Sequence, residues 1–146
     1  MKMTREEINS ILFKILEPEE AQLDSPSNKD WDILSDKFKC EFSDDFKFFI
    51  DLMSKYMFPG DIYNVATGKN NGNDSINFVY DYEMNSGDWD KDFIPFYGIG
   101  NGDYFCLNIK ECPQSKVYYF YHEDLRIEVY SDSFEMWIKD LPNFLG

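Results

Sequence analysis

The sequence predicts an α+β fold in a single domain, residues 1–146, with N-terminal helices and a C-terminal helix packed around an antiparallel β-sheet of about five to six strands. Apolar residues recur with helical spacing at both ends of the chain, whereas most of the segment between residues 61 and 130 alternates with a period of two. Short, hairpin-length connections separate the strand-like runs, which favours antiparallel pairing over βαβ units. A chain of 146 residues with 43% hydrophobic content is long enough and apolar enough to bury one core.

Three helices are expected in the N-terminal part, each introduced by a residue that can cap it. Thr4 and Glu7 match a capping box, Ser27 precedes the second helix, and Ser43 precedes the third. The buried positions share helical spacing: Ile8, Ile11, Leu12, Ile15 and Leu16 in the first helix, Trp31, Leu34 and Phe38 in the second, and Phe46, Phe49, Ile50, Met53 and Met57 in the third. We expect the third helix to run on to Pro59-Gly60.

Six strands are predicted between the third and last helices. They cover residues 61–66, 76–83, 93–97, 104–109, 117–122 and 126–130, with a polar loop at 68–75. Ile76, Phe78, Tyr80 and Tyr82 alternate with more polar residues, which is typical of a strand with one buried face. Pro95 indicates an edge position or a bulge, because proline has no N–H group to donate. A final helix is expected after Ser133, burying Phe134, Trp137, Ile138 and Leu141.

The glycines of GIGNG predict a turn, not a phosphate-binding loop. Gly98, Gly100 and Gly102 are spaced two apart and a strand-like run follows them, whereas a dinucleotide loop needs a different spacing and a helix behind it. Asn101-Gly102 between two β-like runs is typical of a tight hairpin, because both residues tolerate a positive φ. Gly100, Asn101, Gly102 and Asp103 are therefore predicted to form a structural turn.

No catalytic residue, metal site or cofactor is predicted. His122 is the single histidine, no nucleophile elbow accompanies it, and it is interpreted as a residue of a turn or of the edge of the core. Asp88, Asp90 and Asp92 match the start of a calcium loop, but the loop would have Phe93 where glycine is needed, so a solvated acidic loop is expected instead. The three cysteines form no CxxC pair and are read as free thiols in a reducing compartment.

The charge of the chain restricts its partners. It carries 28 acidic and 14 basic side chains, a net charge of −14, which repels nucleic acid and anionic lipid and attracts basic macromolecules. The alternative is that the acidity serves solubility alone. The N-terminus lacks a continuous apolar segment and no later run is long enough to span a membrane, so a cytoplasmic protein without membrane contact is expected.

Several segments resemble the SUKH superfamily, the bacterial relatives of the yeast Smi/Knr cell-wall regulator. The resemblance is carried by Trp31 with Leu34, the segment 41–49, FIPF at 93–96, GNGDYFCL at 100–107, VYYFYHE at 117–123, and Ser133-Phe134 with Trp137 and Leu141. It covers nearly the whole chain in the right order. Ser43 departs from the family, since many members have proline there, and segment 85–92 has no fixed family counterpart.

The resemblance implies helices flanking an antiparallel sheet and the role of an immunity protein that neutralises a cognate toxin, often a nuclease, without enzymatic activity. We expect a monomer or weak homodimer whose acidic surface docks on a basic toxin. The expected partner-binding residues are Tyr82, Glu83, Asp88, Trp89, Asp90 and Asp92. Trp89 would be the aromatic anchor of that surface, or else would fold back onto the sheet. The other function classes considered are a regulatory scaffold for an endogenous partner and a hydrolase.

Overall fold

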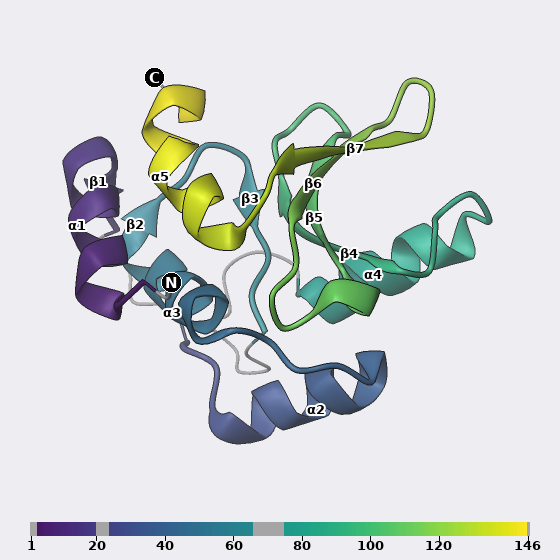
Figure 1. Cartoon of the computed structure of the whole chain (residues 1–146), viewed down its shortest axis with the longest axis horizontal. Coiled ribbons are helices and arrows are strands. Elements are labelled where there is room, and N and C mark those ends of the chain that lie inside the picture. Colours follow the sequence, from purple (N-terminus) through teal and green to yellow (C-terminus); the bar gives the residue numbers. More distant parts are fainter. Residues whose placement is uncertain (1–2, 20–23, 66–74, 146) are drawn as a thin grey trace.

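The computed structural model describes residues 3–19, 24–65 and 75–145 (Figure 1). The helices in this part of the chain are α1 (Arg5–Ile15), α2 (Asn28–Phe38), α3 (Asp44–Leu52), α4 (Ile76–Asn85) and α5 (Phe134–Leu145), with short 3-10 turns at Met53–Lys55 and Ile109–Glu111. The strands are β1 (Glu17–Pro18), β2 (Tyr56–Met57), β3 (Asp61–Ile62), β4 (Phe93–Gly98), β5 (Tyr104–Asn108), β6 (Val117–Tyr121) and β7 (Arg126–Ser131). Apart from Ser75, the loop predicted at 68–75 lies outside the described residues, as does Ala66 of the first predicted strand.

The main sheet has the order β3-β4-β5-β6-β7, and every neighbouring pair is antiparallel. Strands β1 and β2 form a separate two-stranded sheet. The predicted α+β class with an antiparallel sheet is confirmed. The predicted bulge is also present, because the β4–β5 register shifts between Pro95 and Tyr97. β4 is nevertheless an interior strand: β3 is short and pairs with Tyr97 and Gly98, so Pro95 has a ladder partner on the β5 side alone.

The predicted caps place the first three helices. Thr4 and Ser27 form capping boxes with Glu7 and Asp30, and the Ser43 hydroxyl accepts the N–H of Phe46. These side chains satisfy N–H groups that have no partner inside the first helical turn.

The end of the third predicted helix is corrected by the structure. α3 ends at Leu52, after which a 3-10 turn leads into β2. The backbone of Met57 pairs with Glu17 and that of Tyr56 with Pro18. The tertiary pairing with β1 therefore replaces the last turn of the expected helix.

The strand predicted at 76–83 is wrong, because these residues belong to helix α4. The Ser75 hydroxyl caps the helix by accepting the N–H of Phe78. Ile76 and Val79, three positions apart, are buried. Phe78 and Tyr82 would lie on the buried face of a strand, but on the helix they are 56% and 65% exposed. The same run of residues fits both periodicities, and burial of Ile76 and Val79 selects the helical one.

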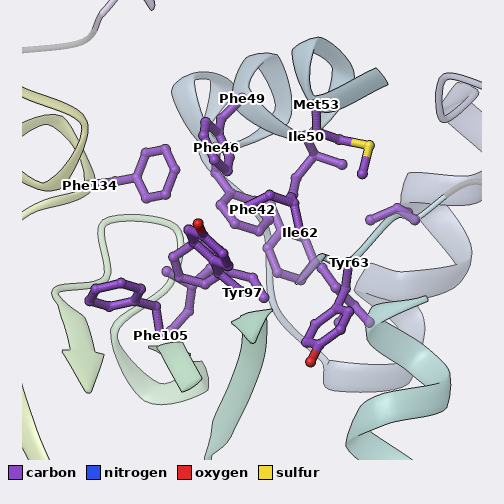
Figure 2. Close-up of a cluster of buried hydrophobic side chains, with 14 of the residues drawn as sticks. Phe42, Phe46, Phe49, Ile50, Met53, Ile62, Tyr63, Tyr97, Phe105 and Phe134 are labelled. Atoms are coloured by element: carbon purple, nitrogen blue, oxygen red, sulfur yellow. The ribbon is translucent and has the colours of Figure 1, made fainter. Parts of the chain in front are cut away.

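An aromatic core fills the space between the sheet and helices α1, α3 and α5. Phe46 and Phe49 of α3 meet Phe134 of α5 with ring centroids 5.3 and 5.7 Å apart, and Phe96 of β4 packs edge-on against Trp137 at 5.2 Å. Figure 2 shows Phe46, Phe49 and Phe134 converging, with Tyr63 at the margin of the cluster and its hydroxyl pointing away from the other labelled residues. Each such ring pair stabilises the fold by about 0.5–1.5 kcal/mol beyond the area it buries.

The opposite face of the sheet has its own cover. Trp89, Cys106 and Phe120 form a second buried cluster there, with Tyr104 packed against it. The Trp89 ring lies 4.8 Å from Phe120 and 5.6 Å from Tyr104, and its Nε1 donates to the carbonyl of Phe93. The segment that follows α4 is thereby fixed against the sheet.

Candidate interaction surface

A hollow of about 220 Å³ opens beside α4. We call it the α4 hollow and define it by its lining residues, Tyr63, Phe78, Val79, Tyr82 and Tyr104. They come from three places in the chain: the residue after β3, helix α4 and the start of β5. The hollow is therefore a product of the tertiary fold.

Helix α4 supplies the exposed wall of the hollow. Phe78 and Tyr82 are four positions apart, so they lie one above the other on the same side of the helix. Exposed aromatic residues in adjacent positions are typical of protein interaction sites.

Tyr63 and Tyr104 also line the hollow, and their side chains are held in place by other residues, so we call them the fixed wall. Their ring centroids lie 6.2 Å apart. The hydroxyl of Tyr63 lies over Gly98 of β4 so closely that a Cβ atom added there would fall 2.1 Å from it. Tyr104 packs against Trp89 on one side and donates its hydroxyl to Glu83 Oε2 at 2.7 Å. Burial raises the pKa of Tyr104, and the Glu83 carboxylate raises it further, so this phenol remains a donor.

The structure places the six predicted partner-binding residues in different environments. Tyr82 lines the α4 hollow, and Glu83 accepts a hydrogen bond from Tyr104, which also lines it. Asp88 and Asp90 are exposed in the segment after α4. Asp92 is half-buried and forms an ion pair with Lys110 at 3.1 Å. The aspartates are not among the residues that line the hollow.

Trp89 is buried, with 8% of its surface exposed, and the anchor interpretation is corrected accordingly. Of the two interpretations of this residue, the structure has the one in which the ring folds back onto the sheet. Trp89 supports Tyr104 from inside the molecule, so its connection to the hollow is indirect.

Three carboxylates on α4 and in the segment after it carry negative charge that no described lysine or arginine compensates. Asp81 on α4 is paired with Lys37 of α2 at 2.6 Å, which leaves Glu83, Asp88 and Asp90 without an ion pair to any described lysine or arginine. An acidic border next to exposed aromatic rings suits a partner that carries positive charge.

A second polar group surrounds Asp103, the residue that directly precedes β5. Its carboxylate accepts the N–H of His122 at 2.9 Å and the hydroxyl of Tyr119 at 2.8 Å, and it lies 2.6 Å from Nδ1 of His122. Burial alone would raise the pKa of Asp103, but the hydrogen bonds from His122 and Tyr119 together lower it.

This group resembles the acid and base of a hydrolytic triad, but no serine, threonine or cysteine lines the pocket beside it. The adjacent pocket of about 180 Å³ is lined by Asn101, Asp103, Tyr121, His122, Glu123, Asp124 and Arg126, none of which is a serine, threonine, cysteine or lysine. The hydrogen bonds of Asp103 stabilise the turn between β4 and β5, because its carboxylate joins this turn to the residue that follows β6.

The turn between β4 and β5 is longer than the tight hairpin predicted, since five residues, 99–103, separate the strands. Gly100 and Gly102 have positive φ values of 100° and 98°, whereas Asn101 does not have a positive φ and uses its side chain to accept the N–H of Asp103. A Cβ atom at Gly102 would lie 2.9 Å from Cγ of His122, so glycine is needed there for space as well as for conformation.

The three cysteines are free thiols. Cys106 is buried, whereas Cys40 and Cys112 are half-buried, and the Cys112 thiol donates to the carbonyl of Asn108 at 3.4 Å. Within residues 3–19, 24–65 and 75–145, no three His, Cys, Asp or Glu side chains are grouped so as to hold a metal ion. None of the helices in those ranges is long and apolar enough to cross a membrane.

The sequence does not predict the α4 hollow, because the alternation at residues 76–83 favours a strand. Ser75 in front of Ile76 was the available signal, since serine is a favoured helix cap and Ile76, Val79 and Tyr80 then follow with helical spacing. No local signal indicated Tyr63 and Tyr104, whose side chains meet through strand pairing across β3, β4 and β5.

Comparison with known proteins identifies a family to which the chain is similar. A family model described as SUKH_5, SMI1-KNR4 cell-wall, matches residues 2–143. The match confirms the resemblance found in the sequence. No curated protein matches the chain.

Proposed function

The chain belongs to the SMI1-KNR4 cell-wall family, SUKH_5, and from this premise we propose that it is an immunity protein that binds and neutralises a basic toxin domain without enzymatic activity. The proposal follows the role implied by the SUKH resemblance. It places the activity in a protein–protein contact and assigns no bond-making step to the chain.

The observation that supports it is the combination of exposed aromatic rings and uncompensated carboxylates on and after α4. Phe78 and Tyr82 supply apolar contact area, and Glu83, Asp88 and Asp90 supply negative charge. A nuclease cleft is positive because it holds phosphates, so a protein with a net charge of −14 is attracted to the same cleft. Occupying that cleft would exclude the nucleic acid substrate.

The proposal is tested by binding to the product of the neighbouring gene, purified as a catalytically inactive variant. Binding should weaken steeply between about 50 and 300 mM salt, because exposed charges are screened. The double variant Asp88→Lys with Asp90→Lys should weaken binding and reduce protection of cells that express the active toxin.

The control changes the same total charge elsewhere. Glu6 and Glu17 are exposed on α1 and β1, on the other side of the molecule from α4 in Figure 1. Glu6→Lys with Glu17→Lys should have a smaller effect than the α4-side pair. Binding that is indifferent to salt and to the Asp88 and Asp90 changes would contradict the acidic-surface proposal.

The description of the matching family favours one second candidate, a regulatory module that binds an endogenous partner of the cell-wall machinery. An adjacent toxin gene and co-purification with its product favour immunity. A gene without such a neighbour, and co-purification with a cell-wall protein, favour regulation.

A further inference from the structure

We propose that the α4 hollow receives an arginine side chain of the partner protein, with the guanidinium held between aromatic rings and the Glu83 carboxylate. The identity of the partner as a basic protein rests on the proposed function. The chemistry of the hollow rests on the residues that line it.

The volume of the hollow suits a single side chain of a partner protein. At about 220 Å³ it is smaller than the roughly 300–1,000 Å³ of a small-molecule site. It is also open along α4, where Phe78 and Tyr82 are more than half exposed. A side chain projecting from a docked protein can enter from this direction.

The residues that line the hollow favour a positively charged ligand. Four of the five residues that line the hollow are aromatic, and the faces of aromatic rings carry the negative end of a quadrupole. Apolar ligands would gain contact area there, but a cation gains contact area and electrostatic attraction together.

Glu83 adds a full negative charge to the border of the hollow. Its Oε2 accepts the Tyr104 hydroxyl, whereas its Oε1 accepts no hydrogen bond from the described residues. That oxygen belongs to the carboxylate that is bound to Tyr104, one of the residues that line the hollow. A planar guanidinium can stack on a ring and donate to a carboxylate at once, which favours arginine over lysine.

The fixed wall is in place before the ligand arrives. Tyr104 is held by Trp89 and Glu83, and Tyr63 is held against Gly98. Little side-chain freedom is then lost on binding, which makes the hollow a better receptor than a flexible patch of the same composition.

The test is an NMR titration of the isotope-labelled protein with N-acetyl-arginine methylamide at constant ionic strength. The matched probe is N-acetyl-citrulline methylamide, which has nearly the same shape and no charge. The arginine compound should give saturable shifts centred on Phe78, Tyr82 and Glu83, and the citrulline compound should bind at least fivefold more weakly.

Variants locate the binding site. Phe78→Leu with Tyr82→Leu should weaken the arginine probe at least fivefold, and Glu83→Gln should weaken it in the same direction. Phe13→Leu is the matched control, because Phe13 is a 69% exposed phenylalanine on α1, away from the hollow. It should leave the titration unchanged.

Equal binding of both probes, or an arginine response that survives the Phe78 and Tyr82 changes, overturns the inference. Binding to the inactive toxin is a separate measurement. If the wild-type protein binds the inactive toxin and the Phe78→Leu, Tyr82→Leu variant binds it equally well, the hollow is not the contact and the proposed function stands. If the wild-type protein binds no toxin, the proposed function fails, and the probe titration still decides whether the hollow is an arginine receptor.

Discussion

Asp103 stabilises the connection between two hairpins through a single carboxylate. It accepts hydrogen bonds from the backbone of His122 and from the hydroxyl of Tyr119, and its side chain is 11% exposed. Hydrogen bonds to a charged and largely buried group are worth more than those between neutral groups. The residue that looks most like part of an active site is therefore expected to act on stability.

Asp103→Asn should lower the free energy of unfolding by about 2 kcal/mol at neutral pH, because the neutral amide makes weaker bonds to the same donors. The pKa of Asp103 is lower in the folded chain than its usual value, so its contribution is present at neutral pH and is lost as the pH falls through that lowered value. Urea denaturation between about pH 7 and pH 2 should show the wild-type and variant curves converging in acid. A constant difference, or an equal effect from the exposed control Glu123→Gln, would contradict this account.

Cys40 should be the first thiol to be alkylated. The neighbouring Cys112 thiol lowers the pKa of Cys40, whereas the Cys40 thiol and burial raise the pKa of Cys112. Burial raises the pKa of Cys106 as well, and the thiolate is the reactive form. Iodoacetamide labelling followed by peptide mass spectrometry should give the order Cys40, Cys112, Cys106. Cys112→Ala should slow the labelling of Cys40, and an unchanged rate would contradict the pairing of the two thiols.

At the scale of the elements, the caps and the apolar spacing predicted α1, α2 and α5, because local hydrogen bonds and one buried face decide such helices. α4 was not predicted, because its alternating aromatic residues also fit a strand and the choice depends on which side chains the sheet buries. The strands β1 and β2, at Glu17–Pro18 and Tyr56–Met57, left no pattern in the sequence, since two residues cannot show a period. Their pairing is a tertiary event.

Trp89→Ala tests how the segment after α4 is held to the sheet. The buried indole packs on Phe120 and Tyr104 and donates to the carbonyl of Phe93, so its removal should lower the free energy of unfolding by about 3–5 kcal/mol. The exposed Tyr82→Ala should change it by less than about 0.5 kcal/mol. A decrease no larger than that of Tyr82→Ala would contradict this account of Trp89.

At the scale of the whole molecule, the net charge and the family could be predicted from the sequence, whereas the α4 hollow could be predicted only in part. Tyr82 and Glu83 were identified from the acidic surroundings of an aromatic segment, and both belong to the α4 hollow or its border. Tyr63 and Tyr104 are brought to them by the five-stranded sheet. A hollow that is lined by residues from three parts of the chain can be located only once the fold is known.

At the scale of the whole molecule, the proposed function is occlusion, in which one molecule of this protein occupies one molecule of its partner and does not alter it. A catalytic inactivator at a small fraction of the toxin concentration inactivates more toxin as time passes. An occluding protein inhibits only as many toxin molecules as it can bind, one for each of its own.

The most direct measurement is therefore a titration of the toxin's activity with this protein, at toxin concentrations well above the dissociation constant. The account predicts that residual activity falls linearly to zero at a molar ratio of one, independently of incubation time, and that full activity returns when the complex is dissociated. Complete inactivation at a small fraction of that ratio, growing with time and persisting after separation, would contradict it.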